Sequence, residues 1–453
     1  MRLRAVTSPD GSTHIRRLTP LLDQGDSSTN IARMAVWKLT QALKDKISHF
    51  ASFPQTGVSL RQMVMFGQNP SAGTLMRASE FLHEELPIRL AHRVKELNEL
   101  PNRLNEMPSI LKVRDWYAQS FEELVNFPRP ELPPELLAHF EKALTKGAPL
   151  PALTPNPSLP LHMQRPLLDT TGKQRIGLSQ RYYVDLGDVV WPPEVHDYNE
   201  RFTQTLSVIK RRHDPVVTTV AQGILEYKDF LAGPGRSSST KASRNPSVID
   251  RSVQTFLDRF YMSRIGIRVL IGQHIALNKL EPHPEYVGVI CTNTNVYQIC
   301  REAIDNALFI CEEHYGYLKA LQFNWSVLKT WPSCMYLAIE SYGFEVLKNS
   351  LRARCDEFPP IKVIVAQGAE DITIKISDEG GGIPRSAVGL VWTYMYTLLK
   401  LNDLTKTLRG QISKLLWLDL YFGGNLKLIS MEGYGTDVYL HLSRLSTTTE
   451  PLQ

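Results

Sequence analysis

Apolar residues recur at helical spacing through most of the first 280 residues. Between residues 71 and 100 they lie three or four positions apart, which places them on one face of an amphipathic helix. Similar patterns predict helices over residues 109–127, 198–230 and 253–280. Because several long amphipathic helices in series favour a bundle, the sequence predicts a helical bundle over residues 31–283.

Two segments interrupt this helical pattern. Residues 128–193 are dense in proline, which cannot sustain long helices, so they predict an ordered loop or a mobile insertion. Residues 232–247 (AGPGRSSSTKASRNPS) are low in complexity and predict a flexible loop. Residues 1–30 contain four arginines, as a mitochondrial presequence would, but three aspartates depart from that pattern. A presequence and a disordered tail are therefore both open for this segment.

After Pro284 the pattern changes from helices alone to helices mixed with short strands. Runs that alternate between apolar and polar residues predict half-buried strands. Helices packed on one face of a mixed sheet would form a two-layer α/β sandwich over residues 284–445, with a tail at residues 446–453, so the predicted fold class is α+β. The predicted helices are residues 295–319 and 334–355, and the predicted strands are residues 361–365, 372–376, 426–429 and 438–442.

Composition and charge narrow the possible classes of function. The formal net charge is only +5 over 453 residues, and the basic residues are scattered, so nothing indicates nucleic-acid binding. No run of 18 apolar residues occurs, which argues against a membrane span. The five cysteines form no CxxC pair, which favours a reducing compartment and argues against a zinc site.

One face of the helix around Glu345 is the first candidate site. At about 100° per residue, the side chains of Glu345, Lys348, Asn349 and Arg352 fall within an arc of about 100°. An asparagine oxygen suits Mg²⁺, and a glutamate can accept a proton from an attacking hydroxyl. An ordinary solvated helix face with charge pairs would show the same pattern, so this helix alone does not decide the function.

A glycine-rich turn at residues 378–384 (DEGGGIP) follows directly from the predicted strand that ends near Ser377. Its three consecutive glycines let the backbone approach a ligand closely. Asp378, at the end of the strand, can accept a hydrogen bond from an exocyclic amine. A second glycine motif at residues 433–436 (GYGT) begins the last strand, although a plain hairpin turn explains it equally well.

Together these segments resemble a known ATP-binding fold. The Glu-x-x-Lys-Asn helix, the Asp-x-Gly-x-Gly turn and the late Gly-x-Gly-Thr strand are similar to the GHKL-type fold, which histidine kinases, DNA gyrase and MutL share. Longer runs resemble the mitochondrial pyruvate dehydrogenase kinases and their branched-chain relatives, over most of residues 50–445. These runs are residues 85–92 (ELPIRLAH), 212–223 (RHDPVVTTVAQG), 264–274 (RIGIRVLIGQH) and 421–436 (YFGGNLKLISMEGYGT).

The resemblance implies an ATP-dependent protein serine kinase that uses Mg²⁺. Such kinases phosphorylate and inactivate the E1α subunit of a 2-oxoacid dehydrogenase complex, and residues 212–229 look closer to the pyruvate type. The resemblance also implies a location in the mitochondrial matrix. It further implies a homodimer whose helical bundle docks on lipoyl domains of the acyltransferase core.

Roles for the catalytic residues follow from the same resemblance. Glu345 would be the general base for the substrate hydroxyl, and Lys348 would hold that carboxylate or a phosphate. Asn349 would ligate Mg²⁺, beside Arg352 as a further contact to the nucleotide. His213 matches a histidine of the helical domain that lies near the active site in relatives.

The adenine pocket is implied in the same way. Asp378 would bind the adenine amine, Gly380 and Gly382 would shape the pocket, and Thr436 would close it. In the family, a glycine-rich lid of the sense Gly-x-Gly-x-Gly-Leu-Pro wraps the phosphates. Here residues 398–420 contain a single glycine. The segment also looks shorter than the family's lid, by about 15 to 20 residues.

Three interpretations of this altered lid are open. The segment arises from an error in gene prediction, or it is a genuine loss, or it is an alternative lid that still closes. A genuine loss would leave a pseudokinase that docks on the complex as a regulatory protein. We expect weak ATP affinity for the chain as it stands, and tight nucleotide binding in calorimetry would contradict this expectation.

Overall fold

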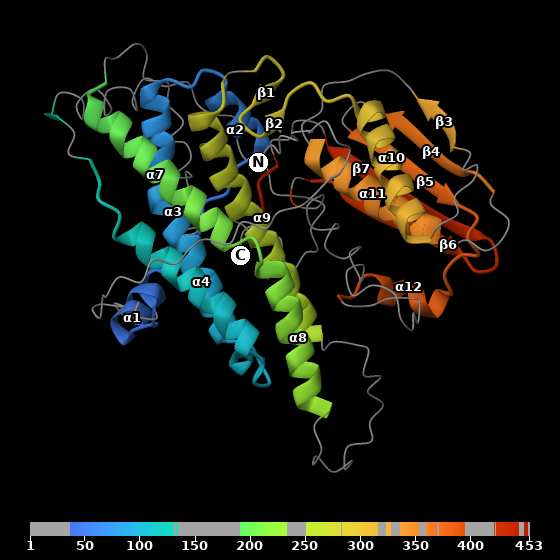
Figure 1. Cartoon of the computed structure of the whole chain (residues 1–453), viewed down its shortest axis with the longest axis horizontal. Helices are drawn as coiled ribbons and strands as arrows, with labels where there is room; N and C mark the ends of the chain where they lie inside the picture. Colours follow the sequence, from blue (N-terminus) through green and yellow to red (C-terminus); the bar gives the residue numbers. More distant parts are fainter. Residues whose placement is uncertain are drawn as a thin grey trace, which may run out of the picture. The chain divides into compact units, whose positions relative to one another are not determined.

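The computed structural model describes residues 37–130, 133–134, 191–232, 251–281, 283–315, 323–327, 336–352, 359–368, 371–394, 421, 423–443 and 448–451. The predicted presequence or tail at residues 1–30 and the altered lid at residues 398–420 lie outside these residues. So do most of the proline-rich segment 128–193 and nearly all of the loop 232–247. The described residues form a set of packed helices and a set of helices on a β-sheet (Figure 1).

Two long helices, α3 (Ala72–Asn98) and α9 (Arg251–Lys279), form the middle of the helical bundle. Both carry buried side chains on nearly every side, as expected of helices in a core position. Helix α3 packs against α1, α4, α7 and α9, so the predicted bundle is present. The other elements of this part are α1 (Gln41–Phe50), α2 (Leu60–Gly67), η1 (Leu104–Glu106), α4 (Pro108–Val125), α7 (Pro193–Arg212), α8 (Val216–Ala232), β1 (Tyr286–Val287) and β2 (Ile290–Cys291).

The ends of these helices follow from local chemistry. Ser59 and Ser71 begin α2 and α3 with capping boxes, in which the serine side chain accepts from a backbone N–H of the first turn. The helical segment predicted over residues 198–230 consists of two helices, α7 and α8, which part at His213. Pro215 explains the break, because proline cannot donate the backbone hydrogen bond that a continuous helix requires.

The second set of elements contains a five-stranded sheet in the order β3-β4-β5-β7-β6. Strands β3 and β4 are parallel and the other neighbours are antiparallel, so the sheet is mixed, as predicted. The four predicted strands correspond to β4–β7, whereas β3 was not predicted. The elements are α10 (Val296–Tyr315), β3 (Phe323–Val327), α11 (Tyr336–Arg352), β4 (Ile361–Gln367), β5 (Asp371–Asp378), α12 (Arg385–Val391), β6 (Asn425–Met431) and β7 (Gly435–Ser443).

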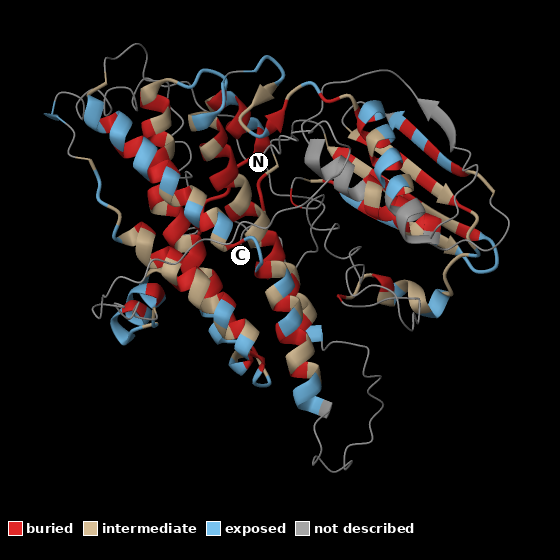
Figure 2. Ribbon diagram, in the orientation of Figure 1, coloured by how far each residue is buried: buried red, intermediate tan, exposed pale blue. Residues whose placement is uncertain are grey.

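Helices α10 and α11 cover one face of this sheet (Figures 1 and 2). Along β5, buried residues alternate with half-buried ones, as in a strand with one face on a core. The inward-facing Ile372, Ile374 and Ile376 belong to one cluster with Leu347 and Leu351 of α11. The predicted two-layer α/β sandwich is therefore confirmed, and its packing fixes α11 above the end of β5.

Candidate active site

Glu345 and Lys348 form a buried ion pair on α11. Lys348 Nζ lies 2.5 Å from Glu345 Oε2, and the two side chains are only 4% and 9% exposed. The same ammonium lies 5.1 Å from the centre of the Phe344 ring, which provides a further favourable contact. Burying two charges is costly unless they are well paired. This face of α11 is therefore not an ordinary solvated surface, which was the alternative left open by the sequence.

Asn349 follows directly on the same helix, and its amide is held in one orientation. Its Nδ2 donates a hydrogen bond of 2.7 Å to the backbone carbonyl of Glu345. The nitrogen side of the amide is thereby turned toward the helix, and Oδ1 is the atom available to a ligand. Asn349 is half-buried. An amide oxygen beside a buried carboxylate and ammonium is thus brought together by one turn of α11.

Asp378 connects this helix to the sheet. It is buried at the end of β5, where Oδ2 accepts from Ser350 Oγ at 2.7 Å. Its other oxygen, Oδ1, accepts from the backbone N–H of Gly380 at 3.0 Å. A carboxylate has about four lone-pair positions, so these two bonds orient Asp378 and leave it able to accept another. Ser350, which the sequence analysis did not single out, therefore positions Asp378.

The start of β7 lies directly beside Asp378. The register of the sheet pairs Asp378 with Thr436, although 57 residues separate them in the chain. A Cβ atom on Gly435 would collide with the backbone carbonyl of Asp378, so only glycine permits this approach. The late glycine motif is therefore more than a hairpin turn, because it brings Thr436 to the end of β5.

The glycine-rich turn packs against the β6–β7 hairpin. Gly381 and Gly382 have φ angles of +87° and +70°, in the left-handed region that favours glycine. The Gly381 N–H donates to the Tyr434 carbonyl at 3.1 Å, and the Gly433 N–H donates to the Gly381 carbonyl at 2.8 Å. The turn is thus fixed by backbone bonds, and its shape depends on the glycines that the sequence indicated.

Ser430 is a second residue that sequence reasoning missed. Its Oγ accepts from the backbone N–H of Ile383 at 2.7 Å and lies 2.9 Å from Thr436 Oγ1. It also donates to the Gly435 carbonyl at 3.2 Å. One hydroxyl on β6 therefore links the end of the glycine-rich turn to Thr436. No local pattern indicates this role, because Ile383, which the hydroxyl links to Thr436, lies 47 residues away from Ser430 in the chain.

A Ser350→Ala variant is expected to bind an adenine nucleotide about five- to tenfold more weakly, because Asp378 loses the bond that orients it. Unfolding should become easier by about 1–3 kcal/mol, since a buried acceptor loses its partner. Calorimetric titration with Mg-ADP and thermal denaturation measure the two effects. A suitable control is Ser207→Ala, whose hydroxyl donates to a carbonyl of its own helix in the bundle. Lower stability with unchanged affinity would restrict Ser350 to a structural role.

His213 lies in the helical bundle, at the end of α7. Its Nε2 is 3.0 Å from Ser120 Oγ, and its ring stacks on Tyr117 with the ring centres 4.4 Å apart. Burial lowers the pKa of the imidazole to about 3, so the ring is neutral at any physiological pH. Among the described residues, the contacts of His213 are with the bundle, and the structure does not bring it together with Glu345.

The remaining predicted site residues are Arg352 on α11 and three residues near the end of β5, namely Gly380, Gly382 and Thr436. Gly380 and Thr436 lie beside Asp378, whereas Gly382 lies against the backbone of Met431 at the end of β6. The side chain of Arg352 lies outside the described residues, although its backbone ends α11. The described site therefore contains the residues of α11 from Glu345 to Ser350, the turn after β5 and the facing ends of β6 and β7.

The donor atoms of this site fit a magnesium ion that is held mainly by phosphates. No group of three His, Cys, Asp or Glu side chains that would hold a metal by itself occurs in the part of the chain that the structure describes. Mg²⁺ at nucleotide sites needs only one or two protein ligands, because phosphates and water supply the rest. Asn349 Oδ1 meets this requirement, whereas the Glu345 carboxylate is already paired with Lys348.

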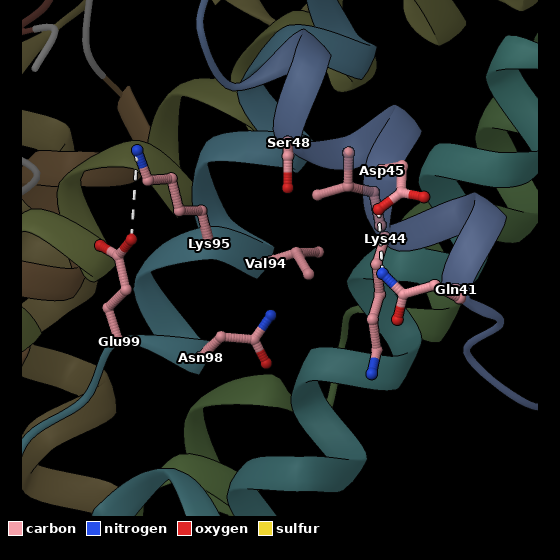
Figure 3. A pocket seen from close by; sticks show the side chains of 9 residues that line it. Gln41, Lys44, Asp45, Ser48, Val94, Lys95, Asn98 and Glu99 are labelled. Atoms are coloured by element: carbon pink, nitrogen blue, oxygen red, sulfur yellow. Dashed lines mark hydrogen bonds and ion pairs between the residues drawn. The ribbon is translucent and has the colours of Figure 1, made fainter.

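A cavity of about 340 Å³ lies elsewhere, between α1 and α3 of the bundle (Figure 3). Two cations, Lys44 and Lys95, and two carboxylates, Asp45 and Glu99, line it. Equal numbers of opposite charges favour no ligand of either sign. Over the described residues, no helix is both long enough and apolar enough to cross a membrane.

Comparison with known proteins identifies the family. Residues 57–291 match the family described as mitochondrial branched-chain alpha-ketoacid dehydrogenase kinase. The chain is 43% identical over 448 residues to a mitochondrial pyruvate dehydrogenase (acetyl-transferring) kinase of Schizosaccharomyces pombe, which covers 92% of this chain and 99% of the relative. A relative of the same description from Arabidopsis thaliana is 35% identical over 91% of this chain and 97% of its own length. Human pyruvate dehydrogenase (acetyl-transferring) kinase isozyme 3 is 31% identical over 92% of this chain and 89% of its own length. The chain therefore belongs to the family of mitochondrial pyruvate dehydrogenase and branched-chain alpha-ketoacid dehydrogenase kinases.

Proposed function

We propose that this chain is an ATP-dependent protein serine kinase that phosphorylates and inactivates the E1α subunit of the mitochondrial pyruvate dehydrogenase complex. The buried pair of Glu345 and Lys348, with Asn349 beside it and Asp378 bonded to the same helix, is the observation that carries this function. Relatives that bear the name pyruvate dehydrogenase kinase over about nine-tenths of the chain support the choice of substrate. Their names also support a mitochondrial location.

Glu345 is suited to the proton transfer that this reaction requires. The serine oxygen of the substrate attacks the γ-phosphorus of ATP, and the bond from that phosphorus to the bridging oxygen breaks to release ADP. The hydroxyl proton passes to the Glu345 carboxylate, while Lys348 holds that carboxylate in place at 2.5 Å. Catalysis of phosphoryl transfer is largely positioning and electrostatic stabilisation, so a rigid buried pair is useful here.

The nucleotide is held by the other residues of the site. Asp378, oriented by Ser350 and Gly380, accepts a hydrogen bond from the adenine amine. Asn349 Oδ1 holds Mg²⁺, which neutralises charge on the phosphates when it is bound. Arg352 adds positive charge on the next turn of α11. Because the pKa of His213 is about 3, this histidine acts as a hydrogen-bonding group and not as an acid near neutral pH.

The proposed setting of the enzyme is the mitochondrial matrix. The helical bundle docks on lipoyl domains of the acyltransferase core, and two copies of the chain act as a homodimer. The family match over residues 57–291, which spans most of the described bundle, supports a bundle of the kind that these kinases use. Light scattering of the purified protein, alone and with an isolated lipoyl domain, tests both associations.

Transfer of phosphate from ATP to purified E1α is the direct test of the proposed activity. We expect phosphoserine on E1α and loss of its activity when the chain, ATP and Mg²⁺ are all present, and none when Mg²⁺ is chelated. Mass spectrometry of E1α detects the product. If the chain binds E1α and its complex but transfers no phosphate, the alternative function holds, in which the altered lid at residues 398–420 leaves a regulatory docking protein.

A further inference from the structure

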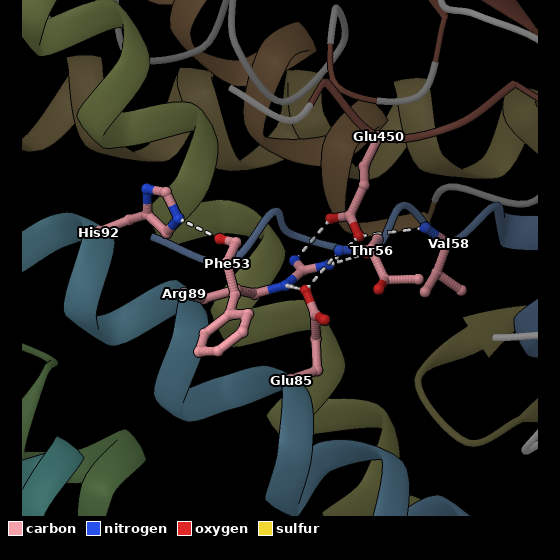
Figure 4. Close-up of polar contacts among 7 residues, drawn as sticks. All are labelled: Phe53, Thr56, Val58, Glu85, Arg89, His92 and Glu450. Carbon is pink, nitrogen blue, oxygen red and sulfur yellow. Dashed lines mark hydrogen bonds and ion pairs between the residues drawn. The ribbon is translucent and has the colours of Figure 1, made fainter. Parts of the chain in front are cut away.

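A fully buried cluster of charges ties the end of the chain to helix α3 (Figure 4). Arg89 Nη1 donates to Glu450 Oε2 at 2.9 Å, and Arg89 Nη2 donates to Glu450 Oε1. The third nitrogen of the guanidinium, Nε, donates to Glu85 Oε1 at 2.8 Å. All three side chains are at most 1% exposed. Residues 448–450, which carry Glu450, are called the strap below.

Bonds to Val58 and Ser59 hold the strap in the bundle beside this cluster. Glu450 Oε1 also accepts from the Val58 N–H at 3.2 Å, and Thr449 pairs with Ser59 in an antiparallel bridge. The segment that the strap contacts is also bonded to α3, because Arg89 Nη2 donates to the Thr56 carbonyl at 2.7 Å. Every polar group of the guanidinium thus has a partner, and the strap occupies one defined position.

Two carboxylates, Glu85 and Glu450, face the single guanidinium of Arg89, so the formal charges of the cluster do not balance. Burial raises the pKa of Glu85, although Arg89 works in the opposite direction. Burial also opposes the charge of Arg89, but the two carboxylates outweigh it and raise the pKa of the guanidinium. Buried ion pairs often contribute little to stability, and their best-attested use is to fix one arrangement among several. The ion pair between Arg89 and Glu450 is therefore suited to holding the strap in one arrangement on the bundle.

The strap also contacts the segment that leads into β6. Ser443 Oγ, at the end of β7, donates to the Gly423 carbonyl at 2.7 Å. Gly423 has φ +90°, and a Cβ atom there would lie 3.4 Å from Thr448 Oγ1 of the strap. In α9, a Cβ atom on Gly266 would collide with Tyr421 Oη and lie 2.7 Å from Glu450 Oε2. Tyr421 and Glu450 therefore meet at the same point of the bundle.

A continuous set of contacts leads from this point to the candidate active site. Gly423 is followed by β6, which runs from Asn425 to Met431. Ser430, near the other end of β6, bonds the glycine-rich turn at Ile383 and lies 2.9 Å from Thr436 Oγ1. A displacement of Tyr421 and Gly423 would therefore move a strand that holds both the turn and Thr436.

We propose that the strap fixes Tyr421 and the start of β6 against the bundle, and that Glu450 and Arg89 are thereby positioning residues for nucleotide binding. This inference rests on the proposed function, because it takes the site around Asp378 to bind ATP. Neither Glu450 nor Arg89 contacts that site among the described residues. Their effect reaches it through Tyr421, Gly423 and β6.

Glu450→Gln tests the strap, because it removes the charge and keeps the shape of the side chain. We expect Mg-ADP to bind about five- to tenfold more weakly, the lower part of the range for coupled sites. Amide hydrogen exchange should rise across residues 424–431, which form β6 and its approach. The matched control is Glu96→Gln, which breaks the 2.6 Å pair with buried Arg93 on the same helix. We expect this control to change neither the affinity nor the exchange of β6.

The two readouts separate a positioning role from a structural one. A Glu450→Gln protein with a lower melting temperature, but with wild-type nucleotide affinity and wild-type exchange in β6, would overturn the inference. Faster exchange in β6 with weaker binding supports it. The exchange measurement needs neither E1α nor nucleotide. If the wild-type chain transfers no phosphate, the proposed activity is rejected. The role of the strap is then still tested by the rate of amide exchange in β6.

Discussion

Glu345→Gln is expected to slow phosphorylation of E1α by about 100- to 10,000-fold, because an amide cannot accept the hydroxyl proton of the substrate serine. Glutamine still offers an oxygen to Lys348, so Mg-ADP affinity should change by less than about tenfold. Single-turnover phosphorylation and calorimetric titration measure the two quantities. The split between a large effect on transfer and a small effect on binding is the signature of a group that acts in the chemical step.

Folding of this variant has to be checked first, since the substitution leaves Lys348 buried without a countercharge. Loss of one partner of a buried pair costs about 3–5 kcal/mol, so the melting temperature should fall. Glu345→Asp is the informative companion, because it keeps the carboxylate and should recover part of the transfer rate. If the folded Glu345→Gln protein phosphorylates E1α within tenfold of the wild-type rate, Glu345 is not the general base.

Asn349→Ala should weaken binding of the Mg-nucleotide by at least about 100-fold, more than the 10- to 100-fold typical for groups outside the ligand shell of a metal. The reason is that Asn349 Oδ1 is the proposed ligand of Mg²⁺, while its Nδ2 is bonded to the Glu345 carbonyl. The loss should depend on the metal. With Mg²⁺ chelated, the wild-type and variant proteins are expected to bind ADP with the same, weaker affinity.

Asn278→Ala is the matched control for this variant. Asn278 Nδ2 donates to the His274 carbonyl at 2.8 Å, which is the same helical bond that Asn349 makes to Glu345. Loss of that bond alone should cost about 1 kcal/mol of stability in either protein and leave nucleotide binding to the control intact. An affinity gap between wild type and Asn349→Ala that persists without Mg²⁺ would show that Asn349 does not act through the metal.

The elements that the sequence predicted well are those whose pattern is local and long. Phe256 and Phe260 mark the buried side of α9, and the alternation at residues 372–376 marks the inner face of β5. Strand β3, residues 323–327, was missed although its residues alternate between apolar and polar, as those of the predicted strands do. It pairs in parallel with β4, so no hairpin turn joins the two strands and marks them as neighbours.

The candidate site was predicted in part, for a similar reason. Glu345, Asn349 and Asp378 belong to motifs with fixed spacing, and the structure brings them together on α11 and the end of β5. Ser350 and Ser430 were missed because a serine shows its role only through its partners, and those partners come from other elements. The burial of the Glu345 face results from tertiary packing, which the spacing of residues along the chain does not reveal.

The strap has a consequence for how the protein is made. Glu450 and Arg89 are 361 residues apart in the chain. At a synthesis rate of about 5–20 residues per second, Arg89 waits roughly 20 to 70 s for that carboxylate after it leaves the ribosome. Contacts of such long separation form late in folding. The bundle therefore cannot be completed from the front of the chain alone, and products cut before residue 450 are expected to keep α3 incompletely packed and open to proteolysis.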